Sequence, residues 1–313
     1  MRQAGRYLPE YRKIKKKYSL EQMFQTPPLA AEITCLPVDI LNVDAAILFA
    51  DILTLPASLG FDIHFDGAQG PVIQTSFETD NIHPFEDLEY LREAIELINQ
   101  QLPPHIPLIG FAGSPFTVAT YLIEGGSAAN YFKTLRLMSL RPEKFSALMD
   151  LLTENTVRYL NLQKQAGIKA FQLFDTWAGI LRAEDFNRWV LPSVQKIFKE
   201  VDLPSIYYVK NCRHLLPLMD FSGADFLSVC HTVTLGQDPV LEHIHKGVQG
   251  NLYNGLLYAD DQTLRREVNN VLVGGQKYER YIFNLSHGVF PDVDVNQLKK
   301  IVDQAHSFKL TRP

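Results

Sequence analysis

The sequence has few cysteines and no long uninterrupted apolar run. Three cysteines in 313 residues, Cys35, Cys212 and Cys230, are too few and too scattered for a disulfide framework, so we expect free thiols. The apolar stretch DAAILFADILTLPASLGF near position 50 is interrupted by Asp51 and Pro56, well short of the roughly 20 apolar residues that a membrane span requires. The sequence therefore predicts neither a disulfide-stapled fold nor a transmembrane segment.

Signals for export and for nucleic-acid binding are also missing. The basic N-terminus MRQAGRYLPEYRKIKKKY lacks the apolar stretch and the small-residue cleavage site of a secretory signal, so we expect a cytoplasmic protein. A formal net charge of −5 argues against a general nucleic-acid binder. Lysines cluster at 13–17, where we expect a solvated helix face.

What the sequence does contain is a repeated alternation of short β-branched or apolar runs with longer segments of helical period. This alternation is typical of helices packed around a parallel sheet. One segment, 146–167, has apolar residues near the 3.6 period and ends at Gly167, as a helix would. No linker or composition shift divides the chain, so we expect one domain over 1–313. The expected strands are 44–49, 106–111, 169–174, 204–209, 225–230, 247–252 and 280–285.

Seven strand and helix units predict a (β/α)8 TIM-type barrel that lacks its N-terminal helix and first strand. We expect this missing strand to precede Met1, and hence the chain to be N-terminally truncated. The segment 61–77 is predicted to form a hairpin in the loop after strand 44–49. An open doubly wound sheet would show a similar alternation, but no glycine-rich phosphate loop follows any predicted strand.

In such a barrel the active site lies where the strands end and the following loops begin. One carboxylate, one imidazole, two guanidiniums and hydroxyls at that rim suggest an anionic substrate and proton transfer. Each of these residues could instead have a purely structural role: Asp51 and Thr176 could cap helices, and His287 could be an ordinary loop histidine. The polar residues expected at the rim are Asp51, Gly113-Ser114-Pro115, Asp175-Thr176, Lys210-Asn211, His231 and Ser286-His287, with Arg2 and Arg6 beside them.

The segment MRQAGRYLPEYR (1–12) resembles the signature of the uroporphyrinogen decarboxylase family. Further similar segments follow in the same order over nearly the whole chain. They are FADILTLPASLG (49–60), GFAGSPFTVATYLIEGG (110–126), LFDTWAG (173–179), VQGNL (248–252) and FNLSHGVFPD (283–292). The resemblance implies a (β/α) barrel, a homodimer, no metal or organic cofactor, and decarboxylation of the four acetate side chains of uroporphyrinogen III to methyl groups in haem biosynthesis.

The resemblance also implies roles for individual residues. Arg2 and Arg6 would clamp substrate carboxylates, with Arg2 a candidate proton donor, and Gln3, Ala4 and Gly5 would line the site with them. Asp51 would accept the pyrrole N–H groups and stabilise a cationic intermediate. Tyr121 and Thr176 would hydrogen-bond the substrate, and His287 would bind a propionate. For Tyr121, simple packing on its helix is the alternative.

Two segments depart from the family pattern, and two other functions stay open. Cys230-His231 stands where the family usually has Asp-Trp, and Tyr253-Asn254 where it has Asp-Pro, through drift or through an altered cavity. A zinc and thiol-dependent corrinoid methyltransferase of the same superfamily would use Cys212, His214 and Cys230 as ligands. The chain could also be an inactive paralogue that only binds tetrapyrrole.

Overall fold

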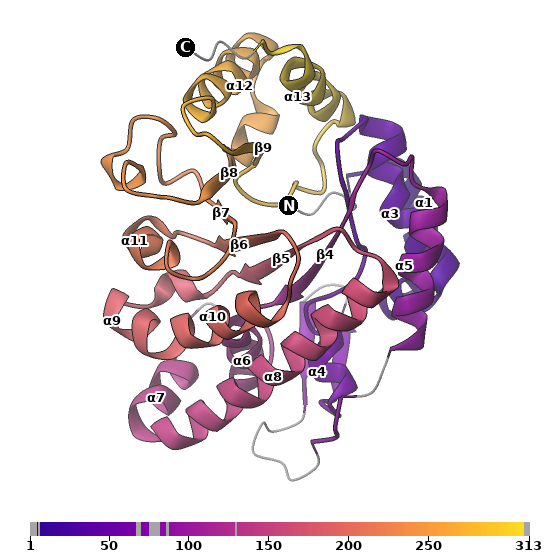
Figure 1. The fold of residues 1–313 in the computed structure, drawn as a ribbon. Helices are drawn as coiled ribbons and strands as arrows, with labels where there is room; N and C mark the ends of the chain where they lie inside the picture. Colours follow the sequence, from indigo (N-terminus) through magenta and orange to yellow (C-terminus); the bar gives the residue numbers. More distant parts are fainter. Residues whose placement is uncertain are drawn as a thin grey trace.

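The computed structural model describes residues 5, 7–66, 70–74, 82–85, 88–128 and 130–309. Seven strands form one parallel sheet in which each strand pairs with the next one along the chain. Seen in Figure 1, the strands follow a curved arc with helices on its outer side. The strands are β1 (Ala46–Ile47), β4 (Leu108–Gly113), β5 (Ala170–Asp175), β6 (Ser205–Val209), β7 (Phe226–Ser228), β8 (Gly247–Leu252) and β9 (Tyr281–Leu285).

This sheet confirms the predicted barrel with one strand missing. Every expected strand is present, and within the described residues no strand joins β1 to β9. The excursion after β1 is the expected hairpin, with β2 (Ile63–Asp66) antiparallel to β3 (Gly70–Ile73). The unbroken order of neighbouring parallel strands excludes the doubly wound alternative, which needs a reversal of strand order.

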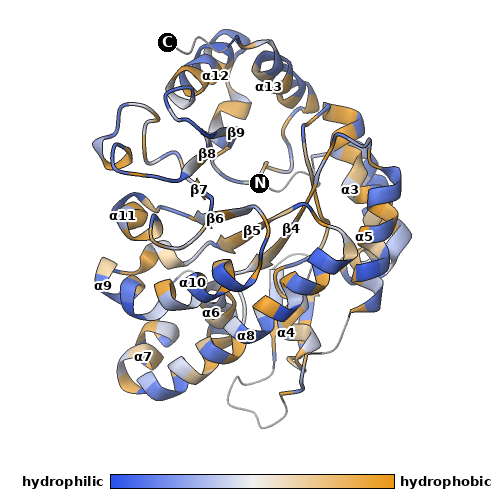
Figure 2. Cartoon of the chain, viewed as in Figure 1, coloured by the Kyte–Doolittle hydropathy of each residue, from blue (hydrophilic) through white to orange (hydrophobic). Residues whose placement is uncertain are grey.

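The helices turn their apolar sides toward the sheet and their polar sides outward (Figure 2). The predicted helix 146–167 is confirmed within α8, which ends at Gly167 with φ of +117°, a conformation that favours glycine. No described helix is long and apolar enough to cross a membrane. The helices are α1 (Pro9–Lys15), α2 (Leu20–Gln25), α3 (Pro27–Leu41), α4 (Thr54–Ser58), α5 (Glu89–Gln101), α6 (Pro115–Glu124), α7 (Phe132–Leu140), α8 (Pro142–Ala166), α9 (Ala183–Asp185), α10 (Leu191–Glu200), α11 (Leu216–Met219), α12 (Asp261–Gly275) and α13 (Val295–Ser307).

Two apolar clusters hold these layers together. The larger one packs the sheet against the surrounding helices. In the smaller one, Tyr7 and Leu8 are buried together with Leu41 of α3, Leu285 of β9 and Ile301 of α13. An open barrel leaves apolar surface uncovered at its edges, and these N-terminal side chains cover part of it between α3 and β9.

Candidate active site

Alternation along β5 and β6 decides which side chains face the interior of the barrel. Tyr207 packs against Phe198 of α10, at 5.6 Å between ring centroids, so it faces the helices. Its neighbour Tyr208 lies 6.3 Å from His287, which follows β9, and this contact runs across the interior. Successive side chains on a strand point to opposite faces. Phe174 and Thr176 therefore belong with Tyr208 to the inner face, and Asp175 belongs to the outer face.

Asp51 stands just after β1, at the carboxyl end of the sheet, and is half-buried. Its Oδ1 accepts a hydrogen bond from the backbone N–H of Leu53 at 2.9 Å, which closes a short turn. Helix α4 formally begins at Thr54, but a bond from the side-chain oxygen of Asp51 to the N–H two residues later is the bond that a helix N-cap makes, so the helix-cap alternative for Asp51 is supported. The turn fixes the position of the carboxylate at the rim.

Tyr121 and Thr176 come from different elements and lie at one wall of the rim. The ring of Tyr121, on α6, lies 6.0 Å from the ring of Trp177, the residue after Thr176. Thr176 is half-buried, and the 3-10 helix Ala178–Ile180 that follows has no side-chain cap, so Thr176 does not cap it. The ring contact with Trp177 supports the packing alternative for Tyr121.

His287 is half-buried after β9, and its tautomer follows from one hydrogen bond. The backbone N–H of Gly288 donates to Nδ1 at 2.8 Å, so the neutral ring carries its proton on Nε2. His231 is exposed, and its Nδ1 lies 3.3 Å from the hydroxyl of Ser286. The ends of β7 and β9 are thereby connected at the rim, where His287 can act as an N–H donor.

The predicted arginine segment lies mostly outside the described residues. Arg2, Gln3, Ala4 and Arg6 belong to that part, so their expected roles remain predictions. Gly5 is described: it is half-buried, and its carbonyl accepts the N–H of Leu8 at 3.1 Å. Leu8 in turn belongs to the cluster beside β9. The described end of the segment therefore lies next to the last strand of the sheet.

Asp175 and Ser114 were expected at the rim, and for both this prediction is wrong. Both are fully buried, and the Ser114 hydroxyl donates to Asp175 Oδ2 at 2.9 Å. The hydroxyls of Thr117 and Tyr207 also donate to this carboxylate, at 2.8 and 2.7 Å. Asp175 thus connects β5 to β6 and α6 on the outer face of the sheet. Strict alternation along β5 would have revealed this, because Thr176 and Asp175 cannot share a face.

Burial raises the pKa of Asp175 to about 6, against the lowering effect of its three hydroxyl donors. Between about pH 4 and 6 the folded protein then holds a proton that the unfolded chain releases, so this carboxyl favours folding less as the pH rises. We expect the stability of the wild type relative to Asp175→Asn to fall by about 2 kcal/mol from pH 4 to pH 6 and to level off only above about pH 7. Paired denaturant titrations across this range measure it, and a difference that rises with pH would contradict it.

The three cysteines are free thiols, as expected. Cys212 and Cys230 interact side chain to side chain, and this hydrogen bond is the main cause that lowers the pKa of Cys230. The Cys230 sulfur also lies 3.0 Å from the Thr232 hydroxyl. The methyltransferase alternative requires His214 as a third ligand, but His214 Nε2 lies 2.8 Å from the carbonyl of Leu181 instead. Among the described residues no three ligand-type side chains gather into a metal site.

The two departures from the family pattern meet in space. The rings of His231 and Tyr253, which follow β7 and β8, lie 4.6 Å apart. Asn251 of β8 donates from Nδ2 to the carbonyl of Cys230 at 2.9 Å. The two altered dipeptides therefore lie at the same part of the rim, where the loops after β7 and β8 pack together.

Gly179 allows the loop after β5 to approach the loop after β6. A Cβ at Gly179 would lie 1.9 Å from the carbonyl oxygen of Lys210, a distance that no packing permits. Gly179→Ala must push the 3-10 helix Ala178–Ile180 away from Lys210, and we expect the melting temperature to fall by about 5–10 °C. Differential scanning calorimetry measures this, and a fall below 1 °C would show that the two loops are not tightly packed.

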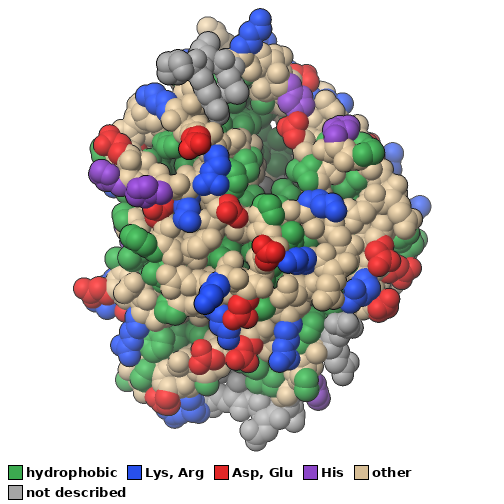
Figure 3. Space-filling view, in the orientation of Figure 1, with side chains coloured by type: hydrophobic (Ala, Val, Ile, Leu, Met, Phe, Trp, Pro, Cys, Tyr) green, Lys and Arg blue, Asp and Glu red, His purple; other side chains and the backbone are tan. Residues whose placement is uncertain are grey.

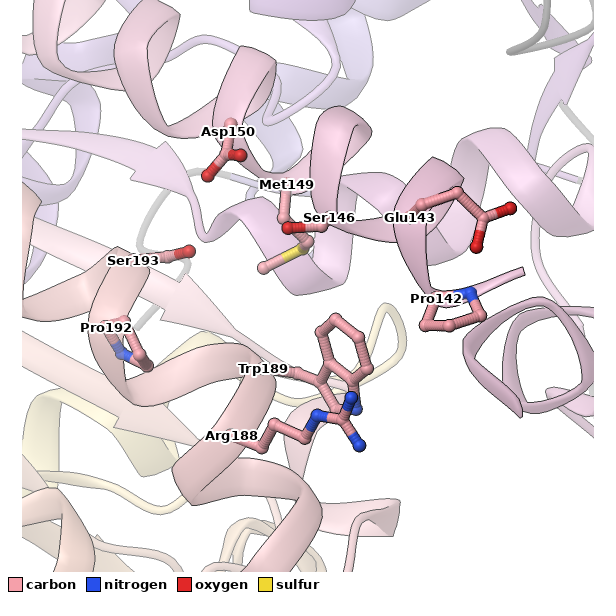
Figure 4. A pocket seen from close by; sticks show the side chains of 9 residues that line it. All are labelled: Pro142, Glu143, Ser146, Met149, Asp150, Arg188, Trp189, Pro192 and Ser193. Carbon is pink, nitrogen blue, oxygen red and sulfur yellow. The ribbon is translucent and has the colours of Figure 1, made fainter. Parts of the chain in front are cut away.

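Two surface grooves lie elsewhere. One, of about 440 Å³, runs between α8 and α10 on the outer helix layer and is lined by Glu143, Asp150, Arg188 and Trp189, among others (Figure 4). The Arg188 guanidinium stacks 4.5 Å over the Trp189 ring. The other lies beside the residues that lead into β8 and β9. Neither groove is lined by the rim residues Asp51, Thr176 and His287.

Comparison with known proteins identifies the family of the chain. The family model described as Uroporphyrinogen decarboxylase (URO-D) matches residues 1–308. The chain is 40% identical to the uroporphyrinogen decarboxylase of Carboxydothermus hydrogenoformans, over 98% of this chain and 90% of the relative. It is 42% identical to that of Thermodesulfovibrio yellowstonii, over 99% of this chain and 93% of the relative.

A solved structure with a similar fold is a methyltransferase from Methanosarcina mazei. It superposes with a TM-score of 0.77 at 18% identity and covers 92% of this chain and 89% of its own. At this level of identity the similarity concerns the fold alone, and it agrees with the curved parallel sheet described above.

Proposed function

This chain belongs to the uroporphyrinogen decarboxylase family, and we propose that it decarboxylates the acetate side chains of uroporphyrinogen III to methyl groups, giving coproporphyrinogen III. It is accordingly a carboxy-lyase of tetrapyrrole synthesis. The observation that carries this proposal is the identity of about 40% to named uroporphyrinogen decarboxylases along almost the whole chain.

The chemistry suits an enzyme that supplies charge and hydrogen bonds. Loss of carbon dioxide leaves an electron pair on the methylene carbon, and a pyrrole ring protonated at carbon can accept that pair. A proton then returns to the methylene carbon to complete the methyl group. The protein must therefore hold the carboxylates, stabilise a cationic ring and deliver protons.

We assign to Asp51 the stabilisation of the intermediate in which the pyrrole ring is protonated and carries a positive charge. The Asp51 carboxylate is half-buried at the rim and is held in position by the Leu53 N–H. An ionised carboxylate close to the ring lowers the energy of the protonated pyrrole. The assignment rests on this geometry and on the resemblance to the family's pyrrole-binding aspartate.

We assign to the remaining site residues the binding of the side chains around the edge of the substrate. Thr176 lies on the inner face of β5, the Tyr121 ring packs against Trp177, and His287 follows β9 on the far side of the interior with its neutral-ring proton on Nε2. Arg2 and Arg6 keep their proposed role as carboxylate clamps, with Gln3, Ala4 and Gly5 beside them. A site with donors on several sides suits a macrocycle that carries carboxylates all around its edge.

We further propose that the protein is a homodimer and lies in the cytoplasm. The exposed apolar residues Phe132, Leu135 and Leu140 on α7 support the dimer, since interfaces commonly cover such side chains. Light scattering of the purified chain measures its mass directly, and a monomer at micromolar concentration would contradict the dimer.

Anaerobic incubation with uroporphyrinogen III tests the function. After oxidation, the porphyrin products are separated by chromatography according to their number of carboxylates. We expect products that have lost carboxylates stepwise, ending at coproporphyrin. An unchanged substrate profile from folded protein would reject decarboxylation.

A further inference from the structure

The adjacent tyrosines of β6 differ in one respect. Both are buried, with 0% and 2% of the surface of Tyr207 and Tyr208 exposed. The Tyr207 hydroxyl donates to Asp175 Oδ2 at 2.7 Å. The Tyr208 hydroxyl has no hydrogen-bond partner within the described part of the chain. A buried hydroxyl without a partner is a net cost to folding, so it calls for an explanation.

The Tyr208 side chain points into the barrel. Its ring lies 5.9 Å from Phe174 on the neighbouring strand and 6.3 Å from His287 after β9. In the sheet, β9 stands three places from β6, so a side chain of β6 reaches His287 only through the interior. Hydrophobic side chains lie deep in a hollow of the molecule beside the C-terminal helices α12 and α13 (Figure 3).

Burial raises the pKa of the Tyr208 hydroxyl far above neutral, so this group stays protonated and can donate a hydrogen bond. A protonated hydroxyl can donate to an acceptor or accept from a donor. In uroporphyrinogen the pyrrole nitrogens carry hydrogen and are donors, whereas the acetate and propionate carboxylates are strong acceptors. A positive charge near this end of β6, that of Lys210, favours a carboxylate over a pyrrole N–H as the partner.

Lys210 adds a positive charge on the same face. It comes two residues after Tyr208, and the register that pairs Asp175 with Val209 places it beside Thr176. Its ammonium lies 5.9 Å over the Trp177 ring, and it is half-buried. Within the described residues no carboxylate forms an ion pair with it. Lys210 directly follows β6, so its ammonium stands at the end of the strand that carries the Tyr208 hydroxyl.

We propose that Tyr208 and Lys210 form a subsite on β6 that binds one carboxylate side chain of the tetrapyrrole. The inference rests on the proposed function and adds two residues to its site. Tyr208 donates its hydroxyl hydrogen to the carboxylate, and Lys210 balances the charge from the rim. The hydroxyl oxygen is covered in this structure, so the side chains around it must move apart when the carboxylate enters.

Phenylalanine substitutions at the two tyrosines test the subsite. Tyr208→Phe removes only the orphan hydroxyl, so we expect KM for uroporphyrinogen to rise about tenfold while the melting temperature stays level or rises slightly. Tyr207→Phe is the matched control. It removes the bond to Asp175, so the melting temperature should fall by several degrees with KM within about twofold of wild type.

Lysine variants test the charge. Lys210→Met should raise KM about as much as Tyr208→Phe, and Lys210→Arg should restore most of the loss. Binding of uroporphyrin I, measured by quenching of its fluorescence, should weaken by the same factor in Tyr208→Phe.

Turnover by the wild type tests the proposed function. The ratio of the uroporphyrin I dissociation constants of Tyr208→Phe and the wild type tests the subsite separately. If the wild type does not turn over but binds uroporphyrin I about tenfold more tightly than Tyr208→Phe, the subsite stands and the function falls. Equal affinities, no binding by the wild type, or a lower melting temperature of Tyr208→Phe with unchanged KM would overturn the subsite.

Discussion

Replacing Asp51 with alanine should lower kcat/KM for uroporphyrinogen by about 10²–10³-fold, the largest effect on activity that we expect from one residue. In the proposed mechanism this carboxylate stabilises the cationic ring, so its loss removes charge stabilisation worth about 3–4 kcal/mol. Anaerobic initial rates at several substrate concentrations measure the change.

Asp51→Asn separates charge from structure. Asparagine keeps an Oδ1 that can accept the Leu53 N–H, so the turn before α4 should survive and the melting temperature should stay within about 2 °C of wild type. The rate should still fall by about 10²-fold, because the negative charge is gone. An asparagine variant with more than a third of wild-type kcat/KM would show that the charge of Asp51 does not act in the reaction.

The largest loss of stability should come from Asp175→Ala, at about 3–5 kcal/mol. The substitution leaves the hydroxyls of Ser114, Thr117 and Tyr207 without their shared acceptor, inside a packed layer between β5, β6 and α6. It also opens a small cavity. Denaturant unfolding at pH 7, where the carboxyl is ionised, measures the loss.

Asp175→Asn is the control for this network. Its side-chain oxygen can still accept hydroxyl hydrogens, and it carries no buried charge, so we expect a loss of about 1–2 kcal/mol or less. If alanine costs less than about 1 kcal/mol, the three hydroxyls must find other partners, and Asp175 does not hold this layer together.

Much of the fold followed from local patterns. The seven strands were predicted close to their observed positions because each is a short apolar run between turn residues, and α8 because its apolar period ends at a glycine. The hairpin of β2 and β3 was visible in its turn residues. These signals depend on residues a few positions apart, so the sequence carries them without knowledge of tertiary contacts.

The sequence predicted which residues of the candidate site stand at strand ends, but not which way their side chains face. The rim position of Asp51, Thr176 and His287 follows from where strands stop, but Asp175 was placed on the wrong face. The error has a simple cause: side chains alternate along a strand, so a residue at the strand end faces the interior or the helices according to whether its position is odd or even. The positions of the strand ends alone do not show which of the two faces a given residue takes.

Local sequence was thus sufficient for the order of strands and helices, the family and the chemical character of the rim, since periodicity, turn residues and motifs are properties of short segments. Three-dimensional packing alone decided that Tyr207 meets Asp175 while Tyr208 meets no partner, that Cys212 lies against Cys230, and that His231 lies against Tyr253. These pairs join residues from different strands or opposite faces of one strand. Their contacts exist only once the sheet has curved and the loops at its carboxyl end have packed together.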